Sequence, residues 1–537
     1  SMSVPKEPDQ VIRHRGGSVL GKKTILKSDH FPGCHNKRLV PNVDGAPNYR
    51  KATSWPVHGV AIATIDGIRN VLDHIANQGI SGSCRVLWIN LREEPVIYIN
   101  GRPFVLRDVE RPFSNLEYTG INRARVEQME DRLRADVLSE SARYGSKILV
   151  TDELPDGQMV DQWEPVSCDS VKTPLEVYKE LGHRYLVDYE RVPVTDEKSP
   201  KEHDFDILVQ KIVEANVRTE IVFNCQMGRG RTTTGMVIAT LIYIKRIEGL
   251  GLEQKSPTGD VSDYASCMNT DAPSSEESIR RGEYTVIRSL IRVLEGGAEG
   301  KRQVDAIIDK CAAMQNLREA IASYRSRILC EADEMKREAS ISFFVEYLER
   351  YYFLICFSVY LQTVKEALYP MPHGRCNFTD WMRARPELYS ILRRLLRRDP
   401  MGALSYGNPR SSAVKQGEPV DGRPVEMSQV AAVRSGEVLG SQTILKSDHC
   451  PGCQHYDLPE KIEGAPNFRK IPGFLVYGVA IPTISGIHSV IRRIGSSKSG
   501  PPVFWHNMRE EPVIYINGKP FVLREVERPY KNMREYT

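Results

Sequence analysis

A strand, a glycine-bearing loop and a helix follow one another without a break between residues 221 and 236, which read IVFNCQMGRGRTTTGM. Residues 221–223 have the apolar composition of a buried strand, and residues 232–244 have the length and apolar content of a helix. Gly228 and Gly230 allow the backbone between these elements to bend sharply. This order is typical of an α/β sheet, in which ligands bind at the carboxyl ends of the strands.

The ends of this loop carry Cys225 and Arg231, a pair suited to attack on a phosphate group. Amide groups that converge at a helix N-terminus bind phosphate oxygens, and the same positive end stabilises a thiolate. We therefore expect Cys225 to be an ionised nucleophile, Arg231 to hold two phosphoryl oxygens, and the Thr232 hydroxyl to donate to the sulfur. The loop amides expected to hold the phosphate are those of Gln226, Met227, Gly228, Arg229 and Gly230. The alternative is a buried structural cysteine beside a surface arginine.

A general acid is also required, because the leaving oxygen of a phosphate monoester must be protonated as it departs. Residues 185–200 read as a strand followed by a loop that lies between Pro193 and Pro200. Asp196 lies near the tip of that loop and is the predicted acid, with Glu197 as the reserve. The alternative is that both are solvated loop carboxylates, since acidic residues are common in loops.

Four segments together resemble one family, the cysteine-dependent, tyrosine-phosphatase-like inositol phosphatases, which include the phytase-like enzymes. These segments are residues 46–50, 91–95, 189–196 and 225–233, and the resemblance covers most of residues 15–398. It implies a phosphocysteine intermediate, with Cys225 and Arg231 as catalytic groups and Asp196 as general acid and then base. One position departs from the family pattern: Asn224 stands where the family usually has a histidine immediately before the nucleophile.

The length of the chain predicts a large globular protein with two or more domains, because 537 residues are more than one hydrophobic core usually accommodates. A net charge of +4 gives no reason to expect nucleic-acid binding. The 11 cysteines are irregularly spaced, which predicts reduced thiols and a cytoplasmic location. No signal peptide is recognisable. The longest apolar stretch, residues 341–361, contains Glu346, Glu349 and Arg350, so it predicts a buried helix and no integral membrane segment, while peripheral membrane contact stays open.

An internal duplication is the second large feature of the chain. Residues 21–30 recur as residues 440–449, and residues 92–101 recur as residues 509–518. We therefore predict a first repeat at 15–398, a linker at 399–429 and the N-terminal part of a second repeat at 430–537. The second copy stops at residues equivalent to 117–119, so nothing equivalent to Asp196, Cys225 or Arg231 follows it. The missing half is expected as a partner, either in cis or from another chain.

The first copy is predicted to form a mainly parallel, tyrosine-phosphatase-like α/β sheet with helices on both faces. A hairpin is expected around the turn Asn100-Gly101. The predicted strands are residues 86–90, 96–99, 104–106, 147–150, 184–192 and 220–223. The predicted helices are residues 122–144, 201–216 and most of 284–368, and a polar loop is expected at 257–276.

Four basic residues are candidate contacts to a substrate with several phosphates. They are Arg229 in the loop, Arg92 after a strand, and Arg50 with Lys51 in the segment that the resembled family places beside its substrate. The alternative for each is a surface charge or an ion pair, and Arg92 next to Glu93 and Glu94 fits a structural role equally well.

The leading hypothesis is a metal-independent phosphatase that acts on inositol polyphosphates or phosphoinositides. A protein tyrosine or dual-specificity phosphatase would share the chemistry, and a scaffold that binds phosphorylated ligands with little turnover is a third reading. No cofactor is expected. Cys450 and Cys453 have metal-ligand spacing near His449 and His455, but no second pair completes a zinc site. The loop lacks the lysine of a nucleotide-binding motif, so no nucleotide is expected.

Overall fold

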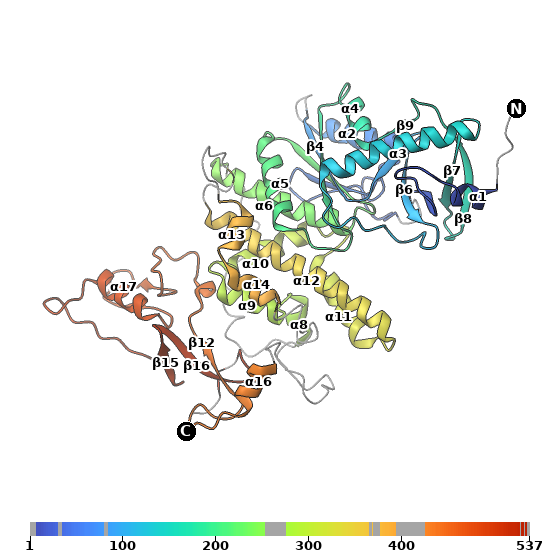
Figure 1. Cartoon of the computed structure of the whole chain (residues 1–537). Coiled ribbons are helices and arrows are strands. Elements are labelled where there is room, and N and C mark those ends of the chain that lie inside the picture. Colours follow the sequence, from blue (N-terminus) through green and yellow to red (C-terminus); the bar gives the residue numbers. More distant parts are fainter. Residues whose placement is uncertain are drawn as a thin grey trace. The chain divides into compact units, whose positions relative to one another are not determined.

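The computed structural model describes residues 7–30, 35–79, 84–252, 275–364, 368, 376–393, 425–526, 528–530 and 532–533. The chain forms two compact units (Figure 1). The first comprises residues 1–255, 307–317 and 364–379, and the second comprises residues 256–306, 318–363 and 380–537. The predicted loop at 257–276 and linker at 399–429 lie outside the described residues except at their last positions, which begin α8 (Ser275–Arg280) and α16 (Val425–Ala432). The predicted domain limits therefore stay a prediction.

The first unit contains a five-stranded, mainly parallel sheet, as the sequence predicts. Its strand order is β10-β4-β11-β3-β2, and only the β2–β3 pair is antiparallel. These strands are β2 (Arg50–Lys51), β3 (Val57–Val60), β4 (Val86–Arg92), β10 (Val187–Val194) and β11 (Glu220–Asn224). All seven residues of β4 are buried, which is typical of a parallel strand covered on both faces.

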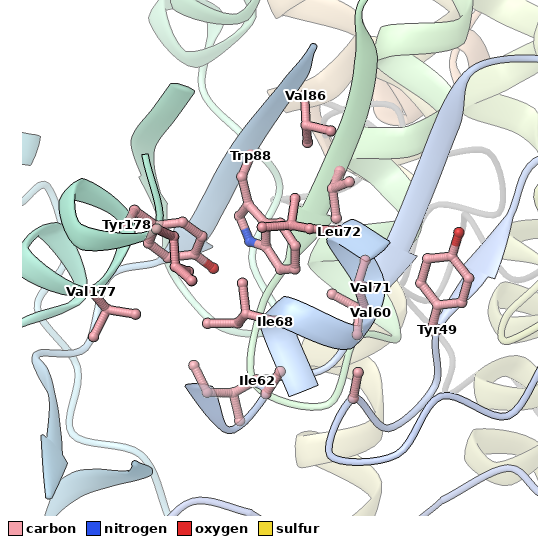
Figure 2. Packing of buried hydrophobic residues seen from close by; sticks show 14 of the residues in the cluster. Tyr49, Val60, Ile62, Ile68, Val71, Leu72, Val86, Trp88, Val177 and Tyr178 are labelled. Atoms are coloured by element: carbon pink, nitrogen blue, oxygen red, sulfur yellow. The ribbon is translucent and has the colours of Figure 1, made fainter. Parts of the chain in front are cut away.

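Helices cover both faces of this sheet. Successive residues of each strand point to opposite faces, so both faces carry apolar side chains that the helices bury. On one face, Figure 2 shows Trp88 of β4 among Ile68 and Leu72 of α2 (Ile65–Gln78) and Tyr178 of α4 (Pro174–Leu181). On the other face lie α5 (Glu202–Glu214) and α6 (Gly230–Gly249), which also pack against each other. Gly235 of α6 lies so close to Phe223 that an added Cβ would be 2.7 Å from its ring.

A second sheet in this unit is mainly antiparallel, and here the structure corrects the sequence-based reading of one strand. The strand predicted at 147–150 was placed in the alternation of the parallel sheet, but it pairs with β8 and β1 in the second sheet. The strand order is β8-β7-β1-β6-β5-β9. The strands are β1 (Thr24–Ser28), β5 (Val96–Ile99), β6 (Arg102–Asp108), β7 (Lys147–Glu153), β8 (Met159–Pro165) and β9 (Val171–Lys172), and helices α1 (Pro8–Arg13) and α3 (Arg123–Arg143) belong to the same unit.

The hairpin and the long helix predicted in this region are confirmed. The turn between β5 and β6 has Asn100 at φ 51° and Gly101 at φ 80°, the left-handed conformations that an Asn-Gly hairpin turn requires. Helix α3 begins after Asn122, whose side chain accepts a hydrogen bond from the Arg125 amide and so caps the helix.

Helices and the second copy make up most of the second unit. The predicted helical region at 284–368 is confirmed, and the apolar stretch at 341–361 lies in one long, largely buried helix. The helices here are α9 (Thr285–Val293), α10 (Gly297–Lys310), α11 (Leu317–Cys330), α12 (Glu334–Thr363), α13 (Phe378–Arg383), α14 (Pro386–Leu392) and α17 (Ile484–Ile494), together with the short 3-10 helix η4 (Pro451–Cys453). Helix α10 and helix α13 each extend across the division between the two units.

The second copy reproduces the register of the first where the two can be compared. Ile444 of β12 pairs with Arg524 of β16 as Ile25 pairs with Arg107 in the first copy. The strands of the second copy are β12 (Thr443–Ser447), β13 (Arg469–Lys470), β14 (Tyr477–Gly478), β15 (Val513–Ile516) and β16 (Lys519–Glu525). Trp505, however, is 40% exposed, whereas the equivalent Trp88 is 1% exposed. The segment equivalent to β4 therefore lacks the cover that β4 has in the first unit.

Candidate active site

Cys225, the predicted acid Asp196 and Glu94 meet at one edge of the five-stranded sheet. Strands β10, β4 and β11 are parallel, so the segments that follow them lie at the same edge. Asp196 follows β10, Glu94 follows β4, and Cys225 follows β11 directly. The topology thus brings together groups that are far apart in the sequence.

The loop after β11 has the backbone geometry of an anion-binding turn. Gly228 adopts φ +66°, and a Cβ there would be 2.5 Å from the Ala61 nitrogen and the Val60 carbonyl carbon. Only glycine fits at this position. The amides of residues 226–229 donate to no partner within the described residues. These amides are therefore available to hold an anion at the start of α6, where the helix dipole adds positive charge.

The Cys225 side chain is buried and polar contacts surround it. Its exposed fraction is 3%, and the Thr232 hydroxyl donates to Sγ at 3.0 Å. Arg50 is also buried, where its Nη2 donates to the Thr233 hydroxyl at 3.0 Å. Burial lowers the pKa of Arg50 to about 10, although Cys225 and Cys311 act in the opposite direction, so Arg50 stays a cation at neutral pH. The sulfur thus has a hydroxyl donor and a positive charge nearby.

Arg231 is held by carboxylates on two sides. Its Nη1 and Nη2 lie 3.2 Å and 3.4 Å from the oxygens of Glu94, and Nη2 lies 3.4 Å from Asp196 Oδ1. Burial opposes its charge, but Glu94, Asp196 and Cys225 outweigh burial and raise the pKa of Arg231. Burial likewise opposes the charge of Glu94, yet Arg231 and Arg92 lower the pKa of Glu94 to about 2. The Nε of Arg231 has no hydrogen-bond partner among the described residues.

Asn115 joins the predicted acid to the phosphate loop. Its Nδ2 donates to Asp196 Oδ2 at 2.9 Å and to Gln226 Oε1 at 2.8 Å. The Gln226 amide in turn donates to Asp29 Oδ1 at 3.1 Å. The side chain of Gln226 is therefore occupied in positioning the loop, which leaves its backbone amide as the group that can face a phosphate.

Arg92 takes the structural role that the sequence left open as an alternative. Its side chain is fully buried and forms ion pairs with Asp29 and with Glu94 Oε2. The second copy has the same arrangement, in which Arg509 pairs with Asp448 and Glu511. The prediction that Arg92 contacts substrate is therefore not supported by its position, because both carboxylates already neutralise it.

The other three predicted basic contacts lie in different surroundings. Arg229 is exposed at the N-cap of α6, beside the loop. Arg50 is buried behind the loop and acts on the sulfur through its charge. Lys51 is exposed, but its charge acts on His58 and Glu220, towards the amino end of β11. Of these residues only Arg229 lies where it can approach a ligand held by the loop amides.

The residue before the nucleophile points its side chain away from the sulfur. Asn224 Oδ1 accepts from Trp88 Nε1 at 2.9 Å, and its Nδ2 donates to Asn90 Oδ1 and to the Cys225 carbonyl, both at 3.3 Å. Asn224 thus fixes the end of β11 against β4. The segment at 46–50 has a similar supporting role, since Asn48 Nδ2 donates to the Met227 carbonyl at 2.9 Å.

Glu94 and Asn115 were not predicted as site residues. Glu94 lies in the segment at 91–95, one of the four segments that resemble the family. Its place directly after a predicted buried strand was the sequence signal that could have identified it as a site residue. Asn115 lies in a segment without periodicity, and no sequence pattern marked it.

Within the described ranges, no group of three or more His, Cys, Asp or Glu side chains is placed to hold a metal ion. No described helix combines the length and apolar character that a membrane crossing requires.

Comparison with known proteins agrees with this geometry. A family model, PTP-like phytase, whose description names inositol hexakisphosphate, matches residues 89–243 and 506–537. The first match contains Glu94, Asn115, Asp196, Cys225 and Arg231, and the second lies in the repeated segment. The chain is similar to PTP-like phytases. The resemblance predicted from the four motifs is confirmed, and the PTP-like phytase match falls on both copies.

Paladins are among the similar proteins, which agrees with the duplicated layout. Paladin from Homo sapiens is 26% identical over 514 residues, which are 89% of this chain and 52% of that protein. Paladin from Danio rerio is 24% identical over 518 residues, which are 90% of this chain and 53% of that protein. The chain thus spans about half the length of these relatives.

Solved structures of PTP-like phosphatases also resemble the chain. The PTP-like myo-inositol phosphatase of Mitsuokella multacida, in complex with myo-inositol-(1,3,4,5)-tetrakisphosphate, has a TM-score of 0.40 at 15% identity and covers 71% of this chain and 50% of that one. The tandemly repeated PTP-like phytase of the same organism has a TM-score of 0.40 at 14% identity and covers 93% of this chain and 66% of that one.

Proposed function

We propose that the first unit is a cysteine-dependent phosphatase that hydrolyses phosphate monoesters of inositol polyphosphates or phosphoinositides. One observation carries the proposal: the Cys225 sulfur accepts from Thr232 at the start of a loop whose amides donate to no described partner, with Arg231 in the same site. This combination supplies a nucleophile, an anion cradle and a fixed positive charge at one place.

In the first step the Cys225 sulfur attacks phosphorus, and the bond between phosphorus and the ester oxygen breaks. Asp196 gives its proton to the departing oxygen, so the alcohol leaves neutral and a phosphocysteine remains. The loop amides and Arg231 Nε hold the phosphoryl oxygens during transfer. Because Glu94 already occupies the two terminal nitrogens of Arg231, it fixes the plane of the guanidinium.

In the second step water attacks the phosphorus of the phosphocysteine. The Asp196 carboxylate takes a proton from that water, and the sulfur leaves as a thiolate while inorganic phosphate forms. The Thr232 hydroxyl, 3.0 Å from Sγ, stabilises the departing thiolate by hydrogen bonding. Asp196 thus ends the cycle protonated and ready for the next ester.

The inositol phosphate assignment rests on the family description and on local charge. The description of the matched family names inositol hexakisphosphate. Arg229 is exposed beside the loop, so a ligand with several phosphates meets a positive charge beyond the groups that hold one phosphate. A cytoplasmic location belongs to the same proposal, because it follows from the cysteine pattern.

The substrate class is tested by comparing inositol hexakisphosphate with a phosphotyrosine peptide at low and high salt. We expect faster phosphate release from the inositol phosphate, and a rate that falls with salt, since exposed charges are screened. Preference for the peptide would defeat the substrate assignment. Binding of either ligand without any phosphate release would instead favour a scaffold, and trapping a phosphoryl group on Cys225 by acid quenching would exclude that reading.

We also propose that the second copy is completed by a complementary segment, in cis or from another chain. Residues 503–509 expose apolar side chains that their equivalents bury: Phe504 is 82% exposed and Met508 is 95% exposed, against 5% for Leu87 and 2% for Leu91. Amide hydrogen exchange of residues 503–509 in protein isolated from its own cells tests this proposal. Slow exchange is expected, and fast exchange there would contradict it.

A further inference from the structure

Two cysteines in the second unit form a close pair that the phosphatase site does not use. Cys450 and Cys453 flank Pro451 and Gly452, and the Cys453 amide donates to the Cys450 carbonyl at 3.0 Å. Both side chains are partly exposed. A Cys-x-x-Cys pair of this kind can close to a disulfide with little rearrangement.

Positive groups surround the Cys450 sulfur. Arg292 Nη2 of α9 donates to Cys450 Sγ at 3.5 Å. Lys446 Nζ is buried with no hydrogen-bond partner among the described residues, and it lies 4.2 Å from the centre of the Tyr530 ring.

The equivalent positions of the first copy differ from those around Cys450. Lys27, the equivalent of Lys446, pairs with Glu153 at 2.6 Å and lies over the Phe113 ring as Lys446 lies over Tyr530. The sequence of the first copy has Phe31 at the position of Cys450. The second copy therefore has a cysteine where the first has an apolar ring.

Backbone packing fixes the pair beside Arg292. Gly452 lies against the end of α9, where an added Cβ would be 1.6 Å from the Ile291 carbonyl oxygen. Glycine is therefore required for η4 to approach the helix this closely. An open cleft of about 460 Å³ within the same unit is lined by His449, Pro451 and Gln454, the residues that flank the two cysteines.

We propose that Cys450 and Cys453 are a redox-active dithiol that undergoes thiol–disulfide exchange with small disulfides such as oxidised glutathione. The Cys450 thiolate attacks one sulfur of the disulfide, which forms a mixed disulfide and releases one thiol. The Cys453 thiol then loses its proton and attacks the Cys450 sulfur, which releases the second thiol. One disulfide is thus reduced to two thiols as the protein pair is oxidised to one disulfide.

The charged groups around the pair determine which of the two sulfurs attacks the disulfide first. The hydrogen bond from Cys453 lowers the pKa of Cys450 to about 5, with Arg292 and Lys446 adding to this effect against burial. The same hydrogen bond, with burial, raises the pKa of Cys453. Burial lowers the pKa of Lys446 to about 6, with help from neighbouring cations. The charged or titratable groups facing the pair are Arg288, Arg292, Lys446, His449 and Arg524.

The test equilibrates the full chain with graded ratios of reduced to oxidised glutathione, then alkylates free thiols and maps the peptides by mass spectrometry. We expect a disulfide between Cys450 and Cys453, and in Cys453→Ser a stable mixed disulfide of glutathione on Cys450. Cys356, which is fully buried, provides an internal control and should stay a thiol. Absence of both products at every ratio in protein that remains folded would overturn the proposal.

Two further variants separate reactivity from folding. Cys450→Phe restores the residue of the first copy, so it should fold and form no disulfide at this site. Arg292→Gln removes the donor to the sulfur, so the thiolate fraction falls and exchange should slow at a pH below the pKa of the thiol, partly offset by the higher nucleophilicity of a more basic thiolate. An unchanged rate in Arg292→Gln would contradict the assigned role of Arg292. Phosphate release by the Cys225 site should be unchanged in Cys450→Phe.

Discussion

Asn115 Nδ2 lies 2.9 Å from Asp196 Oδ2 and donates to it, while the second hydrogen of the same amide is donated to Gln226 at 2.8 Å. One side chain therefore joins the loop that carries the proposed acid to the loop that carries the nucleophile. Asp196 also lies 3.4 Å from Arg231, so two contacts hold it at the site even though its side chain is 41% exposed. The acid is positioned by neighbours from other segments.

Replacing Asn115 should reduce catalysis more than substrate binding. Asn115→Ala removes two hydrogen bonds, and the loss of the one to Asp196, about 0.5–1.5 kcal/mol, corresponds to a loss of roughly 2-fold to 10-fold in kcat. We expect little change in KM, because Asn115 does not reach the loop amides that hold the phosphate. Steady-state kinetics with inositol hexakisphosphate measure both constants. A rise in KM with unchanged kcat would show that Asn115 serves binding instead.

Asp196→Asn should remove the proton donor and lower kcat by about 100-fold to 10,000-fold, the usual range for general acid catalysis. The loss should be smaller with p-nitrophenyl phosphate, because its leaving group departs without protonation. Comparing the two substrates therefore measures the acid step itself. Glu197→Gln serves as the matched control, and if that variant suffers the larger loss, Glu197 is the acid and the assignment of Asp196 is wrong.

The nucleophile loop could be predicted from the sequence because its signals are local. Strand, glycines and helix lie within residues 221–236, and β11 and α6 form there. The carboxylates around Arg231 could not be derived in the same way. Glu94 reaches Arg231 only because β4 and β11 are neighbours in parallel, and pairing between distant strands leaves no local pattern.

Gly228→Ala should collapse the site, whereas Gly251→Ala should not. Both glycines adopt φ +66°, so each substitution costs about 1–2 kcal/mol in backbone strain. At Gly228 the new Cβ would also overlap Val60 and Ala61 at 2.5 Å, while at Gly251 nothing lies within 4 Å. Thermal unfolding and activity of the two variants measure the difference. Equal behaviour of the two variants would mean that the tight approach at Gly228 is unimportant.

Glu94→Gln should destabilise the protein, because it leaves Arg92 and Arg231 with less buried negative charge. Breaking a buried ion pair by removing one partner costs about 3–5 kcal/mol in the free energy of unfolding. Glu511→Gln is the matched control in the second copy, where Arg509 is 22% exposed against 0% for Arg92, so the loss should be smaller. Urea denaturation of both variants tests this, and equal losses would contradict it.

The lowered pKa of Glu94 predicts that the folded protein loses stability at acid pH. The pKa of Glu94 is lowered from 4.5 to about 2, so its stabilising effect is fully present above pH 4.5 and is lost as pH falls towards 2. The wild type should therefore lose stability faster than Glu94→Gln across this interval. Parallel slopes of the two proteins between these pH values would show that Glu94 is not held ionised by its arginines.

The position of strand 147–150 shows a second limit of prediction from sequence. Its apolar residues suit either sheet, and the pairing with Met159–Pro165 decides which sheet it joins. Arg92 was equally ambiguous, since an arginine after a strand suits a ligand or an ion pair. The ion pairs of Arg92 recur at Arg509, Asp448 and Glu511, a relationship that only the three-dimensional structure of both copies reveals.

Phosphate release from inositol hexakisphosphate by wild-type protein, Cys225→Ser and Cys311→Ser tests the central claim most directly. Cys311 is a second buried cysteine near Arg50, and burial raises its pKa to about 12, so it should not act as a nucleophile. We expect Cys225→Ser to abolish release while still binding the substrate, and Cys311→Ser to keep the wild-type rate. Undiminished release by Cys225→Ser would contradict the account.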